Sequence, residues 1–222
     1  AAGAKTVIAL DKDEAAMASL PKEIVRVACD LADAAAMEKT LTNVLATHSV
    51  DVLVNNAGIL HSAPLVNMLS KDASRFATAA ADWQRVLDAN LSSAFYVTQL
   101  VADHMAKKRV KGVIVNMGSV CALGNAGQSA YSASKAGVVA LTRVWAKELG
   151  PLGIRAVAIA PGYIDTPSTR KAVTEAQLAT ITDRVPLKQL GRPEHILQAL
   201  RFIIENDYVN GTVIEVDGGL TV

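Results

Sequence analysis

The chain has 222 residues, of which 51% are hydrophobic and 19% are charged, and its formal net charge is +1. This length fits one large α/β domain, and the composition excludes a disordered chain. Nucleic acid is not an expected partner, because a surface that binds it needs an excess of basic residues. No apolar run approaches the roughly 20 residues that cross a bilayer, so we expect a cytoplasmic protein without membrane contact.

The cysteines and histidines give no sign of a disulfide framework or a metal site. The two cysteines, Cys29 and Cys121, are far apart in the sequence. The four histidines do not cluster at the spacing of metal ligands. We therefore predict no bound metal.

Apolar runs rich in β-branched residues alternate with longer amphipathic stretches along the chain. This rhythm predicts repeated strand–helix units and a mainly parallel sheet. The runs are mostly apolar and do not alternate with polar residues, as is typical of strands that helices cover on both faces. We predict a single doubly wound, Rossmann-like α/β domain over residues 1–222, with strands at residues 6–10, 24–28, 50–54, 113–117, 154–159 and 212–216.

Four helices are also predicted. Residues 34–47 carry apolar side chains at the spacing of one buried helical face, and residues 82–108 and 132–149 are longer amphipathic stretches. A shorter helix is expected to begin at Pro193, because proline is well tolerated at the first helical position. No repeat or linker divides the chain.

Tyr131 and Lys135 form a Y-x-x-x-K pair at the start of a predicted helix, and this spacing places both side chains on one face. A nearby ammonium stabilises a phenolate, so the pair can pass a proton. Ser119 follows the predicted strand at 113–117, at the edge where open parallel sheets bind ligands. A packing role for Tyr131 and a capping role for Ser119 are the structural alternatives.

Six motifs in register then resemble the short-chain dehydrogenase/reductase family over nearly the whole chain. They are Asn55-Asn56-Ala57-Gly58, Asn90 in Asp88-Ala89-Asn90-Leu91, Ser119 in Asn116-Met117-Gly118-Ser119, the Tyr131–Lys135 pair, Pro161-Gly162-Tyr163-Ile164-Asp165-Thr166, and Asp217-Gly218-Gly219. The resemblance is to 3-oxoacyl-ACP reductases and to hydroxyacyl or hydroxysteroid dehydrogenases.

The resemblance implies an oxidoreductase that moves a hydride between NAD(H) and a secondary alcohol or ketone, for example a 3-hydroxyacyl or hydroxysteroid-like substrate. It implies that Tyr131 is the general acid/base and that Lys135 lowers the Tyr131 pKa and holds the nicotinamide ribose. It further implies that Ser119 anchors the substrate oxygen and that Asn90 steadies a water leading from Lys135 to solvent. A positioned base contributes about 10²- to 10⁴-fold to such a reaction.

Cofactor contacts are implied in the same way. A carboxylate at Asp11, where the first strand ends, accepts hydrogen bonds from the adenosine ribose and repels a 2′-phosphate, which favours NAD over NADP. Lys12 next to it is the counter-argument. The predicted dinucleotide contacts are Asp11, Asp30, Leu31, Asn56, Ala57, Gly58, Tyr131, Lys135, Pro161, Gly162, Ile164 and Thr166.

The family's first strand and its T-G-x-x-x-G-x-G turn do not occur in this sequence. That strand is central in the 3-2-1-4-5-6 order, so without it we expect unpaired strand edges and no helix N-terminus for the pyrophosphate. We expect the working protein to carry roughly 25 to 40 further residues, about one strand–helix unit; a mass near 23.3 kDa for active protein would contradict this. The competing interpretation is a fragment or degenerate homologue that binds no dinucleotide.

Two stretches depart from the family pattern. Ser119 and Tyr131 are 12 positions apart, which is shorter than usual, and residues 59–81 are longer than in the simplest members. His61, Met68 and Arg75 in the second stretch either reach the active-site mouth or a neighbouring subunit, or belong to a surface excursion.

The segment at residues 167–189 has apolar residues in a partly helical pattern. It forms either an apolar lid over the site or a helix packed on its own domain. Cys121, close to Ser119, either lines the pocket or is a buried, inert thiol, and we expect the second.

The long helices carry more apolar residues than one buried face needs, which predicts a homotetramer. The alternative to an enzyme is a non-catalytic scaffold that keeps the fold for assembly without dinucleotide binding. A scaffold has no need to keep Asn90, Ser119, Tyr131 and Lys135 together.

Overall fold

The computed structural model describes residues 3–66 and 78–221. Its strands lie within one or two residues of the predicted ones. In chain order the elements are β1 (Ile8–Asp11), α1 (Glu14–Ala18), β2 (Val25–Ala28), α2 (Ala34–Thr47), β3 (Val52–Asn55), α3 (Ala80–Leu87), the π-helical turn η1 (Asp88–Ser92), α4 (Ser93–Lys108), β4 (Val113–Met117), the 3₁₀ turn η2 (Val120–Leu123), α5 (Ser129–Leu149), the 3₁₀ turn η3 (Gly150–Leu152), β5 (Arg155–Pro161), α6 (Pro167–Ala172), α7 (Glu175–Arg184), α8 (Pro193–Glu205) and β6 (Val213–Val216).

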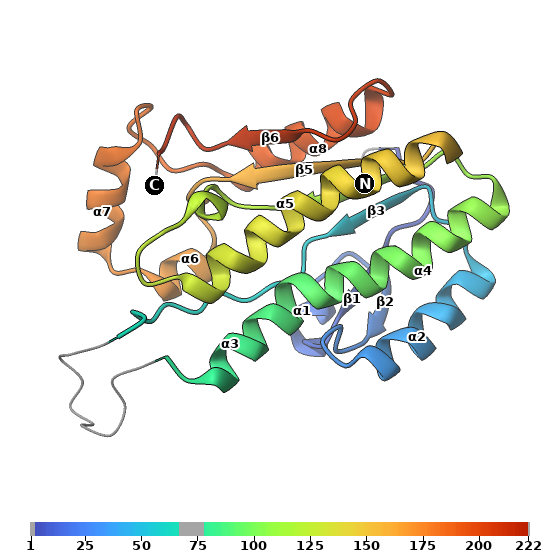
Figure 1. Cartoon of the computed structure of the whole chain (residues 1–222), viewed down its shortest axis with the longest axis horizontal. Helices are drawn as coiled ribbons and strands as arrows, with labels where there is room; N and C mark the ends of the chain where they lie inside the picture. Colours follow the sequence, from blue (N-terminus) through green and yellow to red (C-terminus); the bar gives the residue numbers. More distant parts are fainter. Residues whose placement is uncertain (1–2, 67–77, 222) are drawn as a thin grey trace.

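The larger sheet has the strand order β3-β4-β5-β6, and every neighbouring pair in it is parallel. All its carboxyl ends therefore lie at one edge, on the left in Figure 1, beside α6, α7 and the C-terminus. Local sequence sets the helix starts: Asp33 accepts hydrogen bonds from the backbone of Ala35 and Ala36 to cap α2, and Pro193 opens α8 as predicted.

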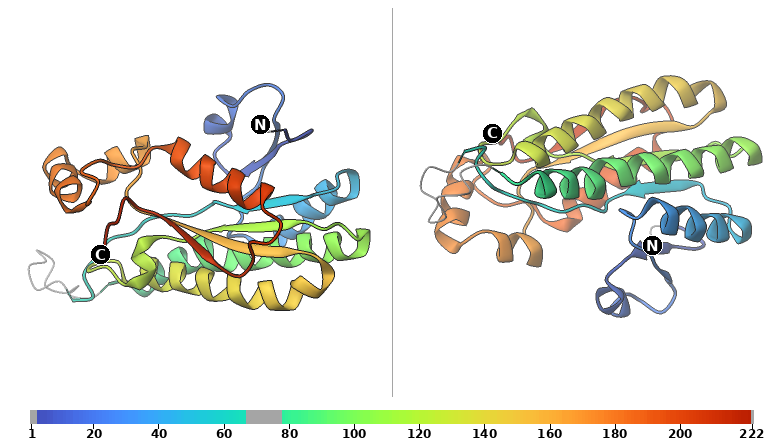
Figure 2. Two further views of the ribbon diagram at one scale, coloured as in Figure 1. Left: turned by 90° about the horizontal axis from the view of Figure 1, so that it is seen from above. Right: turned by 60° about the horizontal axis from the view of Figure 1, so that its bottom comes forward.

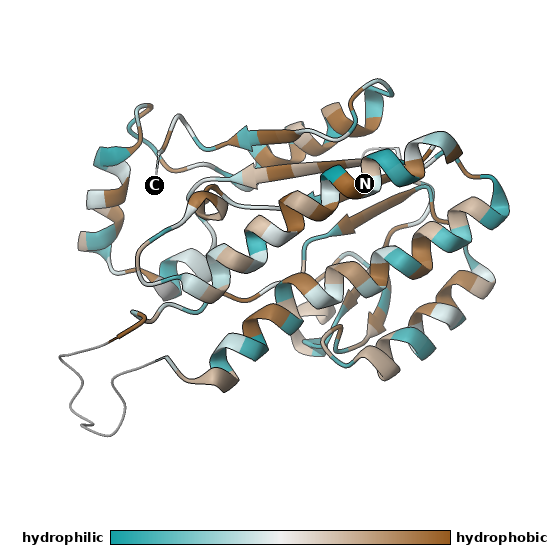
Figure 3. Ribbon diagram, in the orientation of Figure 1, coloured by the Kyte–Doolittle hydropathy of each residue, from teal (hydrophilic) through white to brown (hydrophobic). Residues whose placement is uncertain are grey.

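Helices cover both faces of this sheet, as predicted. On one face, Ile114 of β4 packs in a core with side chains of α2, α4 and α5. On the other, Val113 and Val115 pack with Ile203 of α8. Figure 3 shows apolar residues along most of β3, β5 and β6, whereas the helices carry a mixture of apolar and polar residues. The predicted doubly wound α/β fold is confirmed, and no helix among the described residues is long and apolar enough to cross a bilayer.

The predicted helix at residues 82–108 is interrupted. It runs as α3 and α4, joined by the π-helical turn at Asp88–Ser92, with Asn90 buried at the centre of that turn. Helical periodicity in a sequence does not reveal one extra residue in a turn. Such π-turns occur often at functional sites.

The strands β1 and β2 form a separate two-stranded parallel sheet. Figure 2 shows this N-terminal unit projecting from the side of the molecule next to β3. Among the described residues, no strand pairs with the edge of β3 that faces away from β4. Val54 in β3 is 36% exposed, whereas Val115 in β4 is fully buried. The unpaired strand edges expected from the sequence are thus present.

Candidate active site

The motif residues gather where the larger sheet ends. Asn55 is the last residue of β3, Ser119 follows β4, and Pro161 is the last residue of β5. Because these strands are parallel and adjacent, the segments that follow them meet at one edge. α5 lies across the same edge with its first turns, which carry Tyr131 and Lys135.

Ser119 is nearly buried, with 9% of its surface exposed. It caps η2, and its hydroxyl oxygen accepts a hydrogen bond from the Cys121 backbone N–H at 3.1 Å. This bond fixes the side chain and leaves the hydroxyl proton free to be donated. Ser119 therefore combines the predicted capping role with an oriented donor beside Tyr131.

Tyr131 and Lys135 lie together on one face of α5. The Lys135 ammonium is 5.7 Å from the centroid of the Tyr131 ring. Lys135 is 5% exposed, and its Nζ donates to the Met117 backbone oxygen at 2.8 Å. The end of β4 thus positions the lysine, and the helix positions the tyrosine relative to it.

The direction of the Tyr131 pKa corrects the sequence-based expectation. Burial raises the pKa of Tyr131 above its ordinary value, the nearby Ser119 hydroxyl opposes this, and the Cys121 and Tyr163 groups add to the rise. Burial lowers the pKa of Lys135 to about 8. For both groups burial is the largest cause of the shift, since it disfavours the charged form.

Asn90 joins the π-turn to the loop after β3. Its Oδ1 accepts from the Ile59 backbone N–H at 2.7 Å, and its Nδ2 donates to the Ile59 backbone oxygen at 2.9 Å. The same Nδ2 donates to Ser134 Oγ at 3.2 Å. A Cβ at Gly58 would lie 3.0 Å from Asn90 Oδ1 and 3.7 Å from Lys135 Nζ. A side chain at position 58 would therefore crowd Asn90, and glycine allows Asn90 and Lys135 to approach the loop closely.

The two glycine motifs at the other end of the site contact each other. A Cβ at Gly162 would lie 2.8 Å from the Cα of Asp217, so only glycine allows this approach. Ile164 pairs with Gly191 in an isolated parallel bridge. Thr166 caps α6 by accepting from the Thr169 backbone N–H at 3.2 Å. The side chain of Thr166 thus has a structural use that the motif does not reveal.

The predicted adenosine contacts lie at the ends of β1 and β2. Asp11 is exposed at the end of β1, where its carboxylate accepts from the Asp13 backbone N–H at 3.0 Å. Asp30 accepts from Lys12 at 3.2 Å and from the Ala32 backbone N–H at 3.1 Å. The Ala32 hydrogen bond is the main reason why the pKa of Asp30 is lowered. Leu31 packs against the core of α2 and α4, so it is at least partly a structural residue.

These residues fit a nicotinamide dinucleotide on one side of the site. An ammonium has three donors, and among the described residues Met117 takes one of those of Lys135. The buried Lys135 ammonium therefore has further donors for the hydroxyl groups of a ribose. The exposed backbone at Asn56-Ala57-Gly58 leaves room beside it for the dinucleotide.

Sequence reasoning anticipated only part of the wall beside Tyr131, through the segment at residues 167–189 and the buried Cys121. Val120, Cys121, Val185 and Leu220 form a buried cluster against which Tyr131 and Tyr163 pack. Cys121 is 6% exposed, which agrees with the predicted buried thiol. Burial also raises the pKa of Tyr163. The P-G-Y motif was the signal for Tyr163, but nothing in the sequence joins the C-terminal Leu220 to this wall.

The loop after β3 packs on the segment that precedes Tyr131. The Ala63 backbone N–H donates to the Gly127 oxygen at 2.7 Å, and Gln128 Nε2 donates to Ser62 Oγ at 3.3 Å. His61 lies with its Nε2 3.7 Å from Asp82 Oδ2. Met68 and Arg75 lie outside the described residues.

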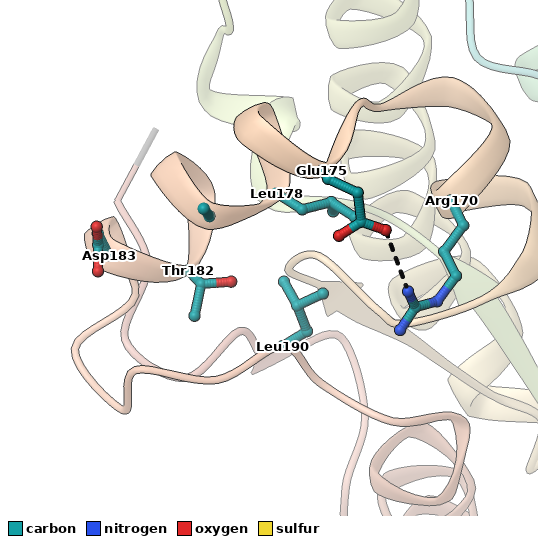
Figure 4. Close-up of a pocket in the computed structure, with 7 residues that line it drawn as sticks. Arg170, Glu175, Leu178, Thr182, Asp183 and Leu190 are labelled. Atoms are coloured by element: carbon teal, nitrogen blue, oxygen red, sulfur yellow. Dashed lines mark ion pairs between the residues drawn. The ribbon is translucent and has the colours of Figure 1, made fainter.

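The segment at residues 167–189 forms α6 and α7. Leu178 is buried, and Val185 just after α7 reaches the wall beside Tyr131. Figure 4 shows the shallow cavity between these helices and Leu190, where Arg170 faces Glu175 at 3.8 Å. Arg170 also binds Asp165 through both carboxylate oxygens. The segment packs on its own domain and also borders the site.

Comparisons with known proteins agree with this geometry. The family described as Enoyl-(Acyl carrier protein) reductase matches residues 1–221. The chain belongs to the short-chain dehydrogenase/reductase family. It is 46% identical over 176 residues to the 3-oxoacyl-[acyl-carrier-protein] reductase FabG of Thermotoga maritima, which covers 78% of the chain and 67% of that relative. It is 38% identical over 196 residues to the (3R)-3-hydroxyacyl-CoA dehydrogenase of Homo sapiens, covering 86% of the chain and 71% of that relative.

Solved structures give the same assignment. A putative gluconate dehydrogenase from Agrobacterium tumefaciens has a TM-score of 0.83 and 32% identity, covering 96% of the chain and 84% of that structure. A 4-hydroxyisoleucine dehydrogenase complexed with NADH has a TM-score of 0.79 and 31% identity, covering 96% and 86%. Short-chain dehydrogenases/reductases are oxidoreductases that act on a hydroxyl or keto group with a nicotinamide dinucleotide.

Proposed function

We propose that this protein is an NAD(H)-dependent oxidoreductase that interconverts a ketone and a secondary alcohol. The observation that carries the proposal is the convergence of Ser119, Tyr131, Lys135 and Asn90 at the carboxyl edge of one parallel sheet. A bound nicotinamide dinucleotide supplies or accepts the hydride. The chain itself orients the substrate oxygen and moves its proton.

The protonation states favour ketone reduction at neutral pH. Burial raises the pKa of Tyr131, so its phenol stays protonated and acts as the acid that donates to the ketone oxygen. Ser119 holds the same oxygen through its free hydroxyl proton. Lys135, with a pKa of about 8, is still mostly cationic at neutral pH and favours negative charge developing on Tyr131.

The substrate class we propose is a 3-oxoacyl or 3-hydroxyacyl compound. Two relatives with 46% and 38% identity are named for 3-oxoacyl and 3-hydroxyacyl substrates. The apolar wall of Val120, Val185 and Leu220 beside Tyr131 supports a hydrophobic substrate. Reduction assays with acetoacetyl and longer 3-oxoacyl thioesters test this against simple cyclic ketones and steroids.

We propose NAD rather than NADP as the cofactor. Asp11 ends β1 with an exposed carboxylate, which repels a 2′-phosphate. Lys12 is paired with Asp30 at 3.2 Å, so its charge is partly used within the chain. Titration with NADH and NADPH tests this choice. Asp11→Ser is expected to weaken NADH binding and so to bring the dissociation constants of NADH and NADPH closer together. An unchanged ratio of the two constants would contradict the role of Asp11.

We also propose that one further parallel strand completes the sheet between β1 and β3. The unpaired edge of β3 and its half-exposed Val52 and Val54 support this. In the Rossmann arrangement, the turn after that strand receives the pyrophosphate. The 222-residue chain is therefore expected to bind NADH more weakly than a chain that carries the strand.

A homotetramer is the proposed assembly. The outer faces of α4 and α5 form a mostly apolar groove in which Phe95 is 40% and Val144 is 45% exposed. Covering these side chains with a second copy would remove them from water. Phe95→Glu combined with Val144→Glu is expected to give a smaller mass by light scattering, and a wild-type mass equal to one chain would refute the assembly.

The decisive test of the function is Tyr131→Phe. The change removes only the phenol oxygen, so turnover with a 3-oxoacyl substrate is expected to fall by about 10²-fold or more. Binding of NADH, measured by fluorescence titration, is expected to stay nearly unchanged. Equal turnover in the variant would rule out the proposed acid.

A further inference from the structure

Ser134 connects Asn90 to the helical turn that carries Tyr131, two residues that the proposed reaction needs at a fixed distance from each other. It is fully buried in the first turns of α5, one residue before Lys135. Its hydroxyl donates to the Tyr131 backbone oxygen at 2.7 Å and accepts from Asn90 Nδ2 at 3.2 Å. Figure 1 shows α5 running beside α3 and α4, which the π-helical turn with Asn90 joins.

Ser134 and the Ile59 backbone together fix which way the Asn90 amide faces. A hydroxyl has one proton, and Ser134 donates it in the hydrogen bond to the Tyr131 backbone oxygen. Ser134 can therefore only accept a hydrogen bond from Asn90. The Asn90 NH₂ group must therefore face Ser134. Ile59 favours the same orientation, because its backbone N–H donates to the Asn90 carbonyl oxygen at 2.7 Å and its backbone oxygen accepts from the Asn90 NH₂ group at 2.9 Å. Ser134 is thus the acceptor for the second proton of that NH₂ group.

This orientation reaches the loop that borders Lys135. Ile59 follows Gly58, and a Cβ at Gly58 would touch both Asn90 Oδ1 and Lys135 Nζ. Asn90 is 2% exposed, so an amide proton that loses its acceptor finds no solvent there. The Asn90 side chain would then rotate to satisfy it, and its hold on Ile59 would weaken.

We propose that Ser134 is a positioning residue that keeps the loop at Gly58–Ile59 in register with Tyr131 and Lys135 by anchoring the Asn90 amide, and with it Ile59, to α5. This inference rests on the proposed function for its kinetic consequence only. Ser134 touches no reacting atom; it acts through Asn90. Without it the fold persists, while the loop and the acid lose their fixed spacing.

The test compares Ser134→Ala with Ser93→Ala in the full chain. Ser93 is a matched control because it is also a buried helical serine, 3% exposed, whose hydroxyl donates to the Ala89 oxygen of the same helical segment at 2.8 Å. Ser134→Ala is expected to lower kcat for ketone reduction about 10- to 100-fold, since small misplacements cost that much. KM for the ketone is expected to change less, and Ser93→Ala is expected to keep kcat within about twofold of wild type.

A double-mutant cycle with Asn90→Ala tests whether Ser134 acts through Asn90. Once Asn90 is removed, adding Ser134→Ala is expected to cause no further loss of kcat. Additive losses would overturn the proposal. Should the alanine variant not fold, Ser134→Cys, of similar size but a weak hydrogen-bonding group, replaces it with the same expectations.

Hydrogen exchange at the Ile59 amide separates this inference from the proposed function. Exchange is expected to be about tenfold faster in Ser134→Ala and unchanged in Ser93→Ala, because only the first loosens the bond to Asn90. If the wild type reduces no ketone with NADH or NADPH, the proposed function fails, and the exchange measurement still decides the role of Ser134. Unchanged exchange at Ile59 in Ser134→Ala would overturn the proposed role of Ser134.

Discussion

Replacing Lys135 with methionine should make the protein more stable at neutral pH while it removes activity. Lys135 is 5% exposed, and its burial lowers its pKa from 10.5 to about 8. A difference of this size means that the charged form of Lys135 makes the folded chain less stable by roughly 3 kcal/mol than the neutral form does. Methionine has similar length, carries no charge and suits an irregular apolar site.

The gain is smaller than the full cost of the ammonium. The substitution also removes the hydrogen bond from Nζ to the Met117 backbone oxygen, which is worth about 1 kcal/mol. The free energy of unfolding at pH 7 should therefore rise by about 2 kcal/mol. For a chain of this size that is a rise of about 4–8 °C in Tm.

The pH dependence identifies the cause. Because the folded-state pKa of Lys135 is lowered, the unfolded wild type binds more protons than the folded one between about pH 8 and 10.5. The free energy of unfolding of the wild type therefore rises as the pH increases through this window, because folded Lys135 loses its proton and the cost of burying the charge disappears. Lys135→Met shows no such rise. The advantage of the variant should have disappeared by about pH 9.5.

Denaturant unfolding followed by circular dichroism at both pH values measures this difference. Lys147→Met is the control, because Lys147 is exposed further along the same helix and its loss should change stability by less than about 0.5 kcal/mol. A Lys135→Met advantage that is independent of pH, or a variant less stable than wild type at pH 7, would refute the reasoning. Ketone reduction should be lost in Lys135→Met in either case.

Two further substitutions test the packing that holds the site. Gly162→Ala places a Cβ 2.8 Å from the Cα of Asp217 and should lower the free energy of unfolding by about 1–3 kcal/mol. Gly150→Ala is the control and should cost much less, because its Cβ would meet its nearest atom at 3.6 Å. Equal effects of the two substitutions in thermal unfolding would argue against the close approach. Asn116→Ala removes a fully buried amide that donates to Thr142 Oγ1 at 2.8 Å and should cost about 1–3 kcal/mol, checked by the denaturant midpoint, and a change below about 0.5 kcal/mol would show that this bond contributes little.

The network around Asn116 also explains why the predicted strand at residues 113–117 tolerates a polar residue in its middle. Asn116 accepts from Asn55 Nδ2 at 2.8 Å, and Asn55 donates to Thr98 Oγ1 at 2.8 Å. These bonds tie β3 and β4 to the helices α4 and α5. The sequence places an asparagine in each strand, but only the packing of the layers shows that they satisfy each other.

The sequence by itself determined the strand–helix rhythm, the parallel sheet and the order of the motifs. Apolar runs such as residues 154–159, in which apolar residues do not alternate with polar ones, require burial on both faces, and that local fact implies the layers. The spacing of Tyr131 and Lys135 placed both on one face of α5, because helix geometry depends only on separation along the chain. The lack of a glycine-rich turn likewise predicted the unpaired edge of β3.

Only the tertiary structure decided the electrostatics of the site. The sequence suggested that Lys135 lowers the pKa of Tyr131, but burial raises it, since desolvation depends on neighbours such as Cys121 and Tyr163 from other segments. The π-turn at Asn90, the bridge through Ser134 and the contact of Gly162 with Asp217 likewise depend on distances between elements. Periodicity records which face a residue takes and carries no information on which atoms meet there.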